Sequence, residues 1–203
     1  MHTILFGMNI LNAEKSLAVA GLGVVIAILT IVAGNTAYSG IDEYVQFQNQ
    51  SVKRELAVRK NLMILRDAQK QYKKANEKFA ANFDTLVNWL RNDSIQQKKQ
   101  IQVNDSTMAE SITMVPAMDV VFPSSKYPNL NIDSLIYVPF GDTNKFVMKA
   151  STVERTGVIV PVFEISTMKI FFLEDIALEN FDRKSVIKIG DLTKPSYNGN
   201  WGE

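Results

Sequence analysis

Few side chains in this sequence have the chemistry of an active site. The chain has no cysteine and one histidine, His2, which precedes a long uncharged stretch. Without thiols, the sequence excludes disulfides, zinc–thiolate sites, iron–sulfur clusters and cysteine nucleophiles. With its one imidazole at position 2, it also excludes a Ser-His-Asp triad or a histidine metal cluster in the C-terminal part. The pair Gly21 and Gly23 lies within the uncharged stretch and lacks the strand–turn–helix context of a phosphate loop.

Neighbouring carboxylates are the remaining candidates for chemistry. They form three acidic pairs: Asp42/Glu43, Glu174/Asp175 and Glu179/Asp182. Paired carboxylates serve glycoside hydrolysis and calcium binding. The spacing here matches no calcium-loop pattern, and solvated turns explain it better. We therefore expect a protein that is not an enzyme, with no cofactor, no metal and no small-molecule substrate.

Positive charge is concentrated between Lys53 and Lys78. This stretch has nine basic and three acidic residues, whereas Val103 to the C-terminus has nine basic and thirteen acidic ones. A solvated helix face is the simplest interpretation. The alternatives are docking against acidic surfaces of neighbouring copies or of a partner, and contact with anionic lipid or nucleic acid. Nucleic acid is the least favoured, because few aromatic residues that could stack on bases interrupt the run. The candidate residues for electrostatic contact are Lys53, Arg54, Arg59, Lys60, Lys70, Lys73 and Lys74.

The uncharged stretch runs for 26 residues from Ser16 to Ile41, with its most apolar part between Leu17 and Ala33. A bilayer core needs about 20 apolar residues in a helix, so we expect a single transmembrane anchor. A cleaved signal peptide is the alternative. It is less favoured because the apolar run exceeds the usual core of a signal and no basic segment precedes it. The lipid bilayer is then the first expected partner.

Small residues are spaced along this stretch in a way that suits close helix packing. Gly23 and Ala27 are four residues apart, as are Ala33 and Ala37. Such spacing lets membrane helices approach each other, so these four residues are a candidate helix–helix interface for a homo-oligomer. The alternative is that glycine and alanine are simply common in membrane helices. Charge counts leave the orientation open, and we expect the long C-terminal region to lie outside the cytoplasm, in the periplasm.

The elements after the anchor predict an α+β fold. Helix-forming composition from Asp42 to about Ala75, with a break at Asn76-Glu77-Lys78, predicts a long amphipathic helix. A short second helix should run from Asp84, its expected N-cap, to Arg91, with Trp89 folding back on the first helix. The expected organisation is an N-terminal segment with a transmembrane anchor (1–41), a basic helical stalk or hairpin (42–92), a polar linker (93–116), a small antiparallel β-sheet head (117–192) and an extended tail (193–203).

From Asp119 onward, the residue pattern changes to the one that is typical of β-strands. The expected strands are Asp119–Phe122, Ser134–Phe140, Lys145–Val153, Val158–Ile165, Met168–Leu173 and Ser185–Ile189. Gly141-Asp142 and Thr156-Gly157 provide turns. Because proline cannot donate to a sheet ladder, Pro139 and Pro161 predict edge strands or bulges.

Several motifs resemble a family of uncharacterised bacterial single-pass membrane proteins. They include Leu65–Tyr72, Asn82-Phe83-Asp84, Ser134–Phe140, Val160–Glu164 and Gly199-Asn200-Trp201. The resemblance covers most of the chain after the anchor and implies no catalytic residue. The layout is also similar to that of type IV pilins and pseudopilins. The likeness is architectural only, because the chain lacks their basic leader and their cleavage glycine before a glutamate at the fifth mature position.

Together these features predict a non-enzymatic, membrane-anchored structural or assembly subunit of a bacterial cell-envelope complex. It would self-associate or bind other envelope proteins. A pilin-like or pseudopilin-like filament subunit is the first alternative, and a tethered ligand-binding or sensory head is the second. A membrane-associated enzyme is the least favoured.

Overall fold

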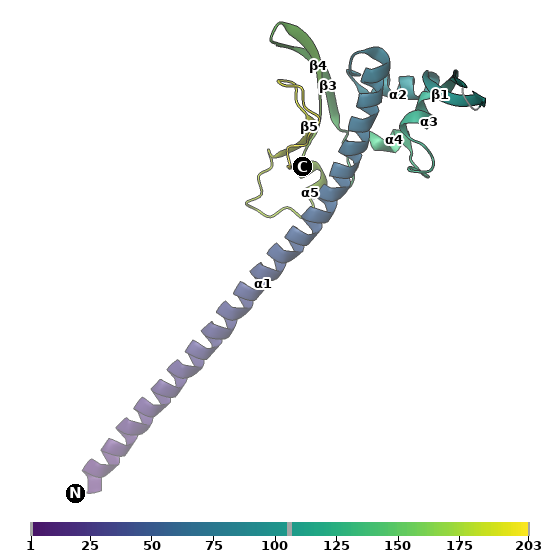
Figure 1. Ribbon diagram of the computed structural model, residues 1–203. Helices are drawn as coiled ribbons and strands as arrows, with labels where there is room; N and C mark the ends of the chain where they lie inside the picture. Colours follow the sequence, from purple (N-terminus) through teal and green to yellow (C-terminus); the bar gives the residue numbers. More distant parts are fainter. Residues whose placement is uncertain (1, 105–106, 203) are drawn as a thin grey trace. The chain divides into compact units, whose positions relative to one another are not determined.

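One helix, α1, runs from His2 to Asn76 and passes through both compact units of the chain, Met1–Asn49 and Gln50–Glu203. The computed structural model describes the backbone of residues 2–104 and 107–202, and the side chains of residues 24–34, 41–97 and 111–202. Five helices and five strands are described, and the strands form a two-stranded and a three-stranded antiparallel sheet (Figure 1). The expected α+β class, with a long helix and small antiparallel sheets, is confirmed.

Among the residues whose side chains are described, no helix combines the length and apolar content that a bilayer crossing requires. Much of the predicted anchor lies outside those residues. Only positions 24–34 and 41 of the uncharged stretch have described side chains.

Helix α1 ends where the sequence Asn76-Glu77-Lys78 predicted a break. The helix stops at Asn76, whose side-chain amide donates to the carbonyl oxygen of Tyr72 at 3.1 Å, and Glu77 has a left-handed φ of 59°. The chain then reverses into α2 (Phe83–Asn92), as expected. The expected N-cap, Asp84, was wrong. Asn82 caps the helix by accepting from the Thr85 N–H at 2.9 Å.

The predicted contact of the two helices is confirmed by an edge-to-face pair of rings. The centroids of Tyr72 and Trp89 are 5.2 Å apart, with an interplanar angle of 76°. Both side chains are buried, so this contact fixes α2 against the last turns of α1.

The segment expected to be a polar linker forms a β-hairpin instead. Strand β1 (Ser94–Asn104) pairs antiparallel with β2 (Thr107–Pro116), and Ser94 lies opposite Pro116. Much of this sequence is polar, so it has a weak hydrophobic pattern from which to predict strands. The turn sequence Asn104-Asp105-Ser106 was the local signal available in this part of the sequence.

The second sheet has the order β3-β4-β5, with β3 at Val147–Arg155, β4 at Val158–Met168 and β5 at Val186–Gly190. Thr156 and Gly157 have φ of 48° and 78° and form the predicted turn between β3 and β4. Pro161 lies in the central strand. It is tolerated there because β5 pairs only with Glu164–Met168, which leaves β4 with one neighbour at the proline.

Three of the expected strands were wrong and contain short helices. These are α3 (Ala117–Val121), α4 (Ile132–Leu135) and α5 (Ile170–Leu173). In α3 the buried residues are Ala117 and Val121, and in α4 they are Ile132 and Leu135. Residues four or three apart share a helix face, whereas strand residues share a face at every second position. Only Tyr137, in an isolated bridge with Lys145, preserves part of the expected strand 134–140.

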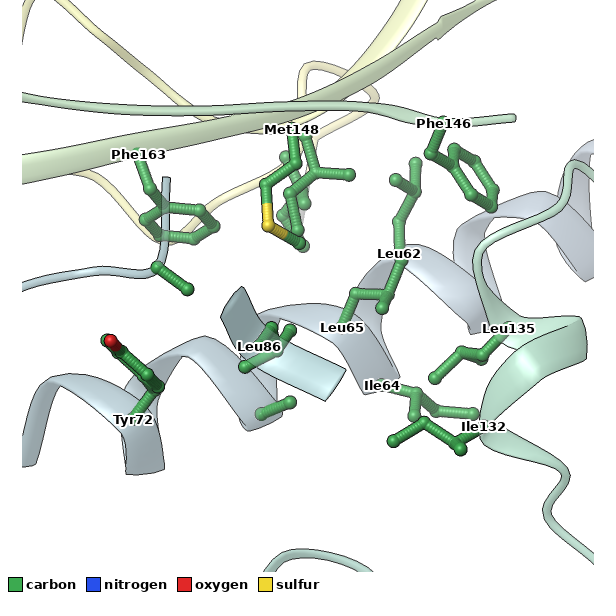
Figure 2. Packing of buried hydrophobic residues seen from close by; sticks show 14 of the residues in the cluster. Leu62, Ile64, Leu65, Tyr72, Leu86, Ile132, Leu135, Phe146, Met148 and Phe163 are labelled. Atoms are coloured by element: carbon green, nitrogen blue, oxygen red, sulfur yellow. The ribbon is translucent and has the colours of Figure 1, made fainter. Parts of the chain in front are cut away.

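The core of the Gln50–Glu203 unit is built on both sides of α1. Leu62 points towards Phe146 and Met148 beside the three-stranded sheet (Figure 2). On the other side of the helix, Ile64 lies beside Ile132 and Leu135 of α4. The predicted amphipathic helix is therefore the centre of the folded unit, and its buried residues are covered from both sides.

One polar residue interrupts the buried stripe. Gln69 is fully buried, and its amide donates to the carbonyl oxygen of Ala80 at 2.9 Å. Its carbonyl oxygen accepts from the N–H of Ala80, also at 2.9 Å. The side chain thus satisfies both backbone groups of a buried residue in the loop between α1 and α2.

Replacing Gln69 should therefore destabilise the fold strongly. Gln69→Leu leaves the N–H and C=O of Ala80 buried without their partner, which should lower the free energy of unfolding by about 2–4 kcal/mol. Urea denaturation followed by tryptophan fluorescence measures this change. Gln71→Leu, two residues further along α1 and partly exposed, is the matched control. Equal stability of the two variants would contradict the role of Gln69.

The C-terminal tail is fixed rather than extended and loose. Asn198 accepts from the Gly190 N–H at 3.1 Å, and Gly199 forms a bridge with Ile189. Tyr197 and Trp201 pack against the core. At Gly190 the φ is 78°, and a Cβ would overlap the carbonyl oxygen of Phe163.

Two glycines with the same φ of 78° should respond differently to alanine. Gly157→Ala meets no atom within 4 Å, so it should cost only about 1–2 kcal/mol for the left-handed conformation. Gly190→Ala adds a backbone overlap and should cost at least about 2 kcal/mol more. The midpoints of urea denaturation of the two variants test this difference, and equal midpoints would refute it.

Candidate functional site

A groove of about 710 Å³ lies between α1 and the segment that follows α3. Its apolar wall includes Met63 and Ile64 from α1, and Tyr127, Pro128 and Leu130 from that segment. The segment is held by turns, since the N–H groups of Lys126 and Tyr127 donate to the Pro123 carbonyl oxygen at 2.9 and 3.0 Å. The Tyr127 ring also packs edge-to-face on Phe122, with centroids 5.5 Å apart.

The rim of this groove is mainly basic. Lys60 and Arg66 lie on the α1 side and Lys126 on the other side. Arg66 donates to the carboxylate of Asp67 at 3.1 Å. The ammonium group of Lys126 lies 5.2 Å from the centroid of the Tyr127 ring. An apolar wall with lysines at its rim can accept an apolar group that carries a negative charge.

A second cluster joins α1 to the region after α5 and is dominated by Arg54. Its guanidinium donates to the Phe172 carbonyl oxygen at 2.9 Å and to the carboxylate of Asp175 at 2.7 Å. It also lies 5.3 Å from the centroid of the Phe140 ring. The hydrogen bonds from Arg54 lower the pKa of Asp175. One member of the acidic pair at 174 and 175 is thus a structural partner of α1.

Glu55 is the centre of a neighbouring ion-pair group. Its carboxylate accepts from Arg59, one turn along α1, and from the Lys169 ammonium at 3.0 Å. Burial raises the pKa of Glu55, but hydrogen bonds from Arg59 and Lys169 outweigh this effect, so the pKa is lowered overall. Arg59 also lies 5.4 Å from the Trp201 ring, which links α1 to the C-terminal tail.

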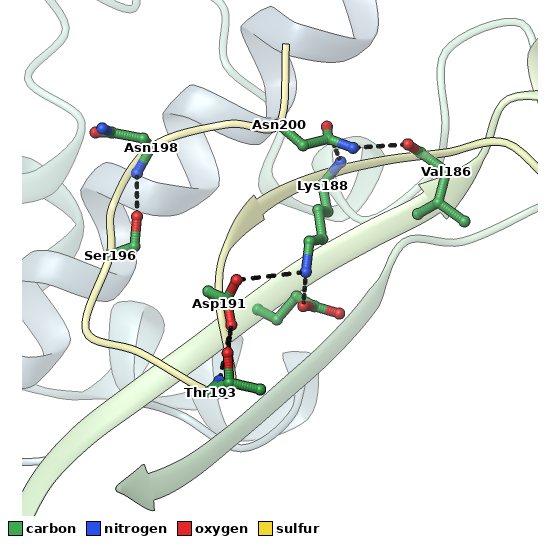
Figure 3. A network of polar contacts seen from close by, with 8 residues as sticks. Val186, Lys188, Asp191, Thr193, Ser196, Asn198 and Asn200 are labelled. Atoms are coloured by element: carbon green, nitrogen blue, oxygen red, sulfur yellow. Dashed lines mark hydrogen bonds and ion pairs between the residues drawn. The ribbon is translucent and has the colours of Figure 1, made fainter. Parts of the chain in front are cut away.

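A polar network joins β5 to the tail (Figure 3). The Lys188 ammonium is 2.7 Å from the Glu164 carboxylate and 3.7 Å from that of Asp191. The hydrogen bond with Glu164 raises the pKa of Lys188, and the one from the Thr193 hydroxyl lowers the pKa of Asp191. The backbone N–H of Lys188 donates to the Asn200 side chain at 3.0 Å. These contacts position the tail, and no catalytic arrangement is evident among them.

Several of the basic residues predicted to make electrostatic contacts with a partner contact other parts of the same chain instead. Arg54 and Arg59 make the contacts described above, Lys70 lies 5.0 Å from the Tyr197 ring centroid, and Lys73 lies 5.0 Å from that of Phe79. Lys53, Lys60 and Lys74 are exposed.

The four candidate interface residues are only partly described. Ala27 and Ala33 are exposed on α1, and the side-chain positions of Gly23 and Ala37 lie outside the described residues.

The sequence did not reveal the groove or the two hydrogen bonds between the Gln69 side chain and the backbone of Ala80. Met63 and Tyr127 are remote in the chain, and no local motif connects them. Among the described residues, no group of three His, Asp or Glu side chains is arranged to hold a metal ion. Comparisons of the chain with protein-family models, curated proteins and solved structures found no match.

The ion pairs of Glu55 should make stability depend on acid pH. A carboxylate with a lowered pKa stabilises the fold above its ordinary value of 4.5 and loses that contribution as the pH falls through the lowered pKa. Glu55→Gln should therefore lose about 1 kcal/mol at pH 7 and little below pH ~3. Urea denaturation at both pH values measures this. Glu154→Gln, at an exposed position, should change neither value, and an equal loss at both pH values would exclude the ion pairs as the cause.

Proposed function

We propose that this protein is a membrane-anchored, non-enzymatic structural subunit of a bacterial cell-envelope assembly, and that it self-associates. The observation that carries the proposal is the exposure of apolar residues around α1. Seven large aliphatic side chains between positions 24 and 32 have exposed fractions of 52–64%: Val24, Val25, Ile26, Ile28, Leu29, Ile31 and Val32. Apolar residues on all sides of a helix need a lipid or protein environment.

The same helix supports a role in assembly. Positions 16–41 hold no charge, and α1 continues from them to Asn76, inside the core of the Gln50–Glu203 unit. An anchor in the same chain would hold the folded domain at the membrane surface. We infer that the C-terminal region lies outside the cytoplasm, where it can contact further copies or other envelope proteins.

A tethered binding head is a second candidate, and the groove of about 710 Å³ favours it. The basic rim at Lys60 and Lys126 fits an acidic ligand with an apolar part. This function would use the same anchor, so it extends the first proposal. A filament subunit of pilin type remains the other alternative, because it also combines an apolar N-terminal helix with a β-rich domain.

Charges placed in the uncharged stretch should release the protein from membranes. Arginine at the centre of a membrane helix costs about 2.5–3.5 kcal/mol per residue, so Ile26→Arg/Leu29→Arg should move from the carbonate-washed membrane pellet to the soluble fraction. Val158→Arg/Ile159→Arg changes two residues that are 60% and 72% exposed on the β3–β4 hairpin and should stay in the pellet.

The same fractionation separates the proposals. Extraction only by detergent supports a resident anchor, and recovery in sheared extracellular fibres supports a filament. Wild-type protein in the carbonate supernatant would exclude the anchor. A strictly monomeric, partnerless chain in solubilised membranes would exclude the assembly role.

A further inference from the structure

Two cations at the rim of the groove between α1 and the segment after α3 are left unpaired by the fold. Lys60 and Lys126 are exposed, and neither forms an ion pair with a described residue. The third cation of the groove, Arg66, is paired with Asp67. Three cations and one carboxylate give the groove a net charge of +2. A molecule that lies in it should therefore carry negative charge.

Two amides in the groove are also left without a partner. Asn61 lies on the α1 wall and Asn129 on the opposite wall, and neither side chain is hydrogen-bonded to a residue that the structure describes. An amide offers both donors and an acceptor, as a peptide group does, so it can bond to the backbone of another chain. Elsewhere in the unit, asparagine side chains hydrogen-bond to this chain's own backbone, at Asn82, Asn131 and Asn200.

The dimensions of the groove suit an extended peptide segment. Its α1 wall runs from Ala57 to Asp67, which is ~15 Å along a helix axis. An extended chain covers this length in about five residues, at roughly 3.3 Å per residue. The cavity of about 710 Å³ is also within the usual range for a ligand site, ~300–1,000 Å³.

The apolar wall restricts the sequence of such a segment. Ile64 is only 7% exposed, and Met63 and Leu130 are half-buried, so together they offer a surface for apolar side chains. Alternate side chains of an extended segment point to the same side. Two apolar side chains can therefore face this wall while the residues between them point to the rim, where Lys60 and Lys126 can pair with carboxylates.

We propose that the groove binds an extended segment of a partner protein, about five residues long, in which acidic and apolar residues alternate. The proposal rests on the binding head considered above and names its ligand. An anionic lipid would satisfy the two lysines and the apolar wall. Its single head group would leave Asn61 or Asn129 unused, because these amides come from opposite walls of the groove. A peptide uses both.

A labelled peptide tests the ligand class. Acetyl-Glu-Leu-Glu-Leu-Glu-amide, with a fluorophore, should bind the full-length protein in nanodiscs of neutral lipid, as measured by fluorescence polarisation. Peptides with Lys in place of Glu, or with Ser in place of Leu, should bind at least about tenfold more weakly, because each removes one of the two matched features. Equal binding of all three peptides, or no binding of the first, would overturn the proposal.

Matched lysine variants test the location. Lys60→Ser/Lys126→Ser should weaken binding of the acidic peptide at least about tenfold. Lys53→Ser/Lys74→Ser removes the same charge at exposed positions outside the groove and should leave binding within about twofold. All four side chains are exposed, so both variants should unfold at the wild-type urea midpoint. Similar losses in both variants would show general attraction to a basic surface and refute the groove.

The amides and the ionic strength provide further measurements. Asn61→Ala and Asn129→Ala should each weaken binding at least about threefold, because each removes hydrogen bonds to the peptide backbone. Asn92→Ala, at an exposed position on α2, should leave it unchanged. At an ionic strength of about 1 M the Debye length is only ~3 Å, so binding should weaken by a factor similar to the loss of the lysines. Unchanged affinity at that ionic strength would contradict the pairing of Lys60 and Lys126.

Lipid vesicles separate this inference from the proposed function. If phosphatidylglycerol vesicles bind in a manner that requires Lys60 and Lys126 while the peptide does not bind, the peptide is refuted and the binding head is retained. If neither probe binds, both are refuted. The membrane anchor and the assembly role are decided independently, by carbonate fractionation and by the oligomeric state.

Discussion

Burial of one face of α1 is the constraint on which the Gln50–Glu203 unit depends. Val58, Leu62, Leu65 and Tyr72 are at most 6% exposed, although each has a partly exposed residue next to it in the helix. The three-stranded sheet packs from one side and α4 from the other. These elements are short, and short strands and single helical turns are not stable alone. Each therefore depends on the apolar surface that α1 provides, so the helix organises the whole unit.

The polar side chains of α1 follow from the same constraint. Gln69 is turned into the core, where it satisfies the backbone of Ala80. Arg54, Glu55 and Arg59 contact the region around α5 and the C-terminal tail. A helix surrounded by other elements has few faces left for solvent, so much of its charge serves internal pairing. The exposed cations that remain, such as Lys60 at the groove, are the ones able to meet an external partner.

Local signals predicted some elements well and others poorly. The end of α1 at Asn76 and the Thr156-Gly157 turn depend on backbone conformations that few residue types favour, so the sequence indicates them directly. The segments 119–122, 134–140 and 168–173 contain too few residues to distinguish a helical from a strand period. The hairpin of β1 and β2 was missed because its stability comes from backbone pairing rather than from a clear apolar pattern. The groove could not be predicted, because it combines residues from α1 with residues near Tyr127.

By itself, the sequence determined the uncharged stretch and the absence of cysteine and histidine chemistry after His2. These properties depend on the order and type of residues along one helix, so no tertiary contact is needed to define them. The tertiary structure decided which polar groups are buried, which basic side chains of α1 are paired, and where a groove is open. Those outcomes depend on distances between residues far apart in the chain, such as Arg54 and Asp175, and hydrogen bonds and ion pairs act only at short range.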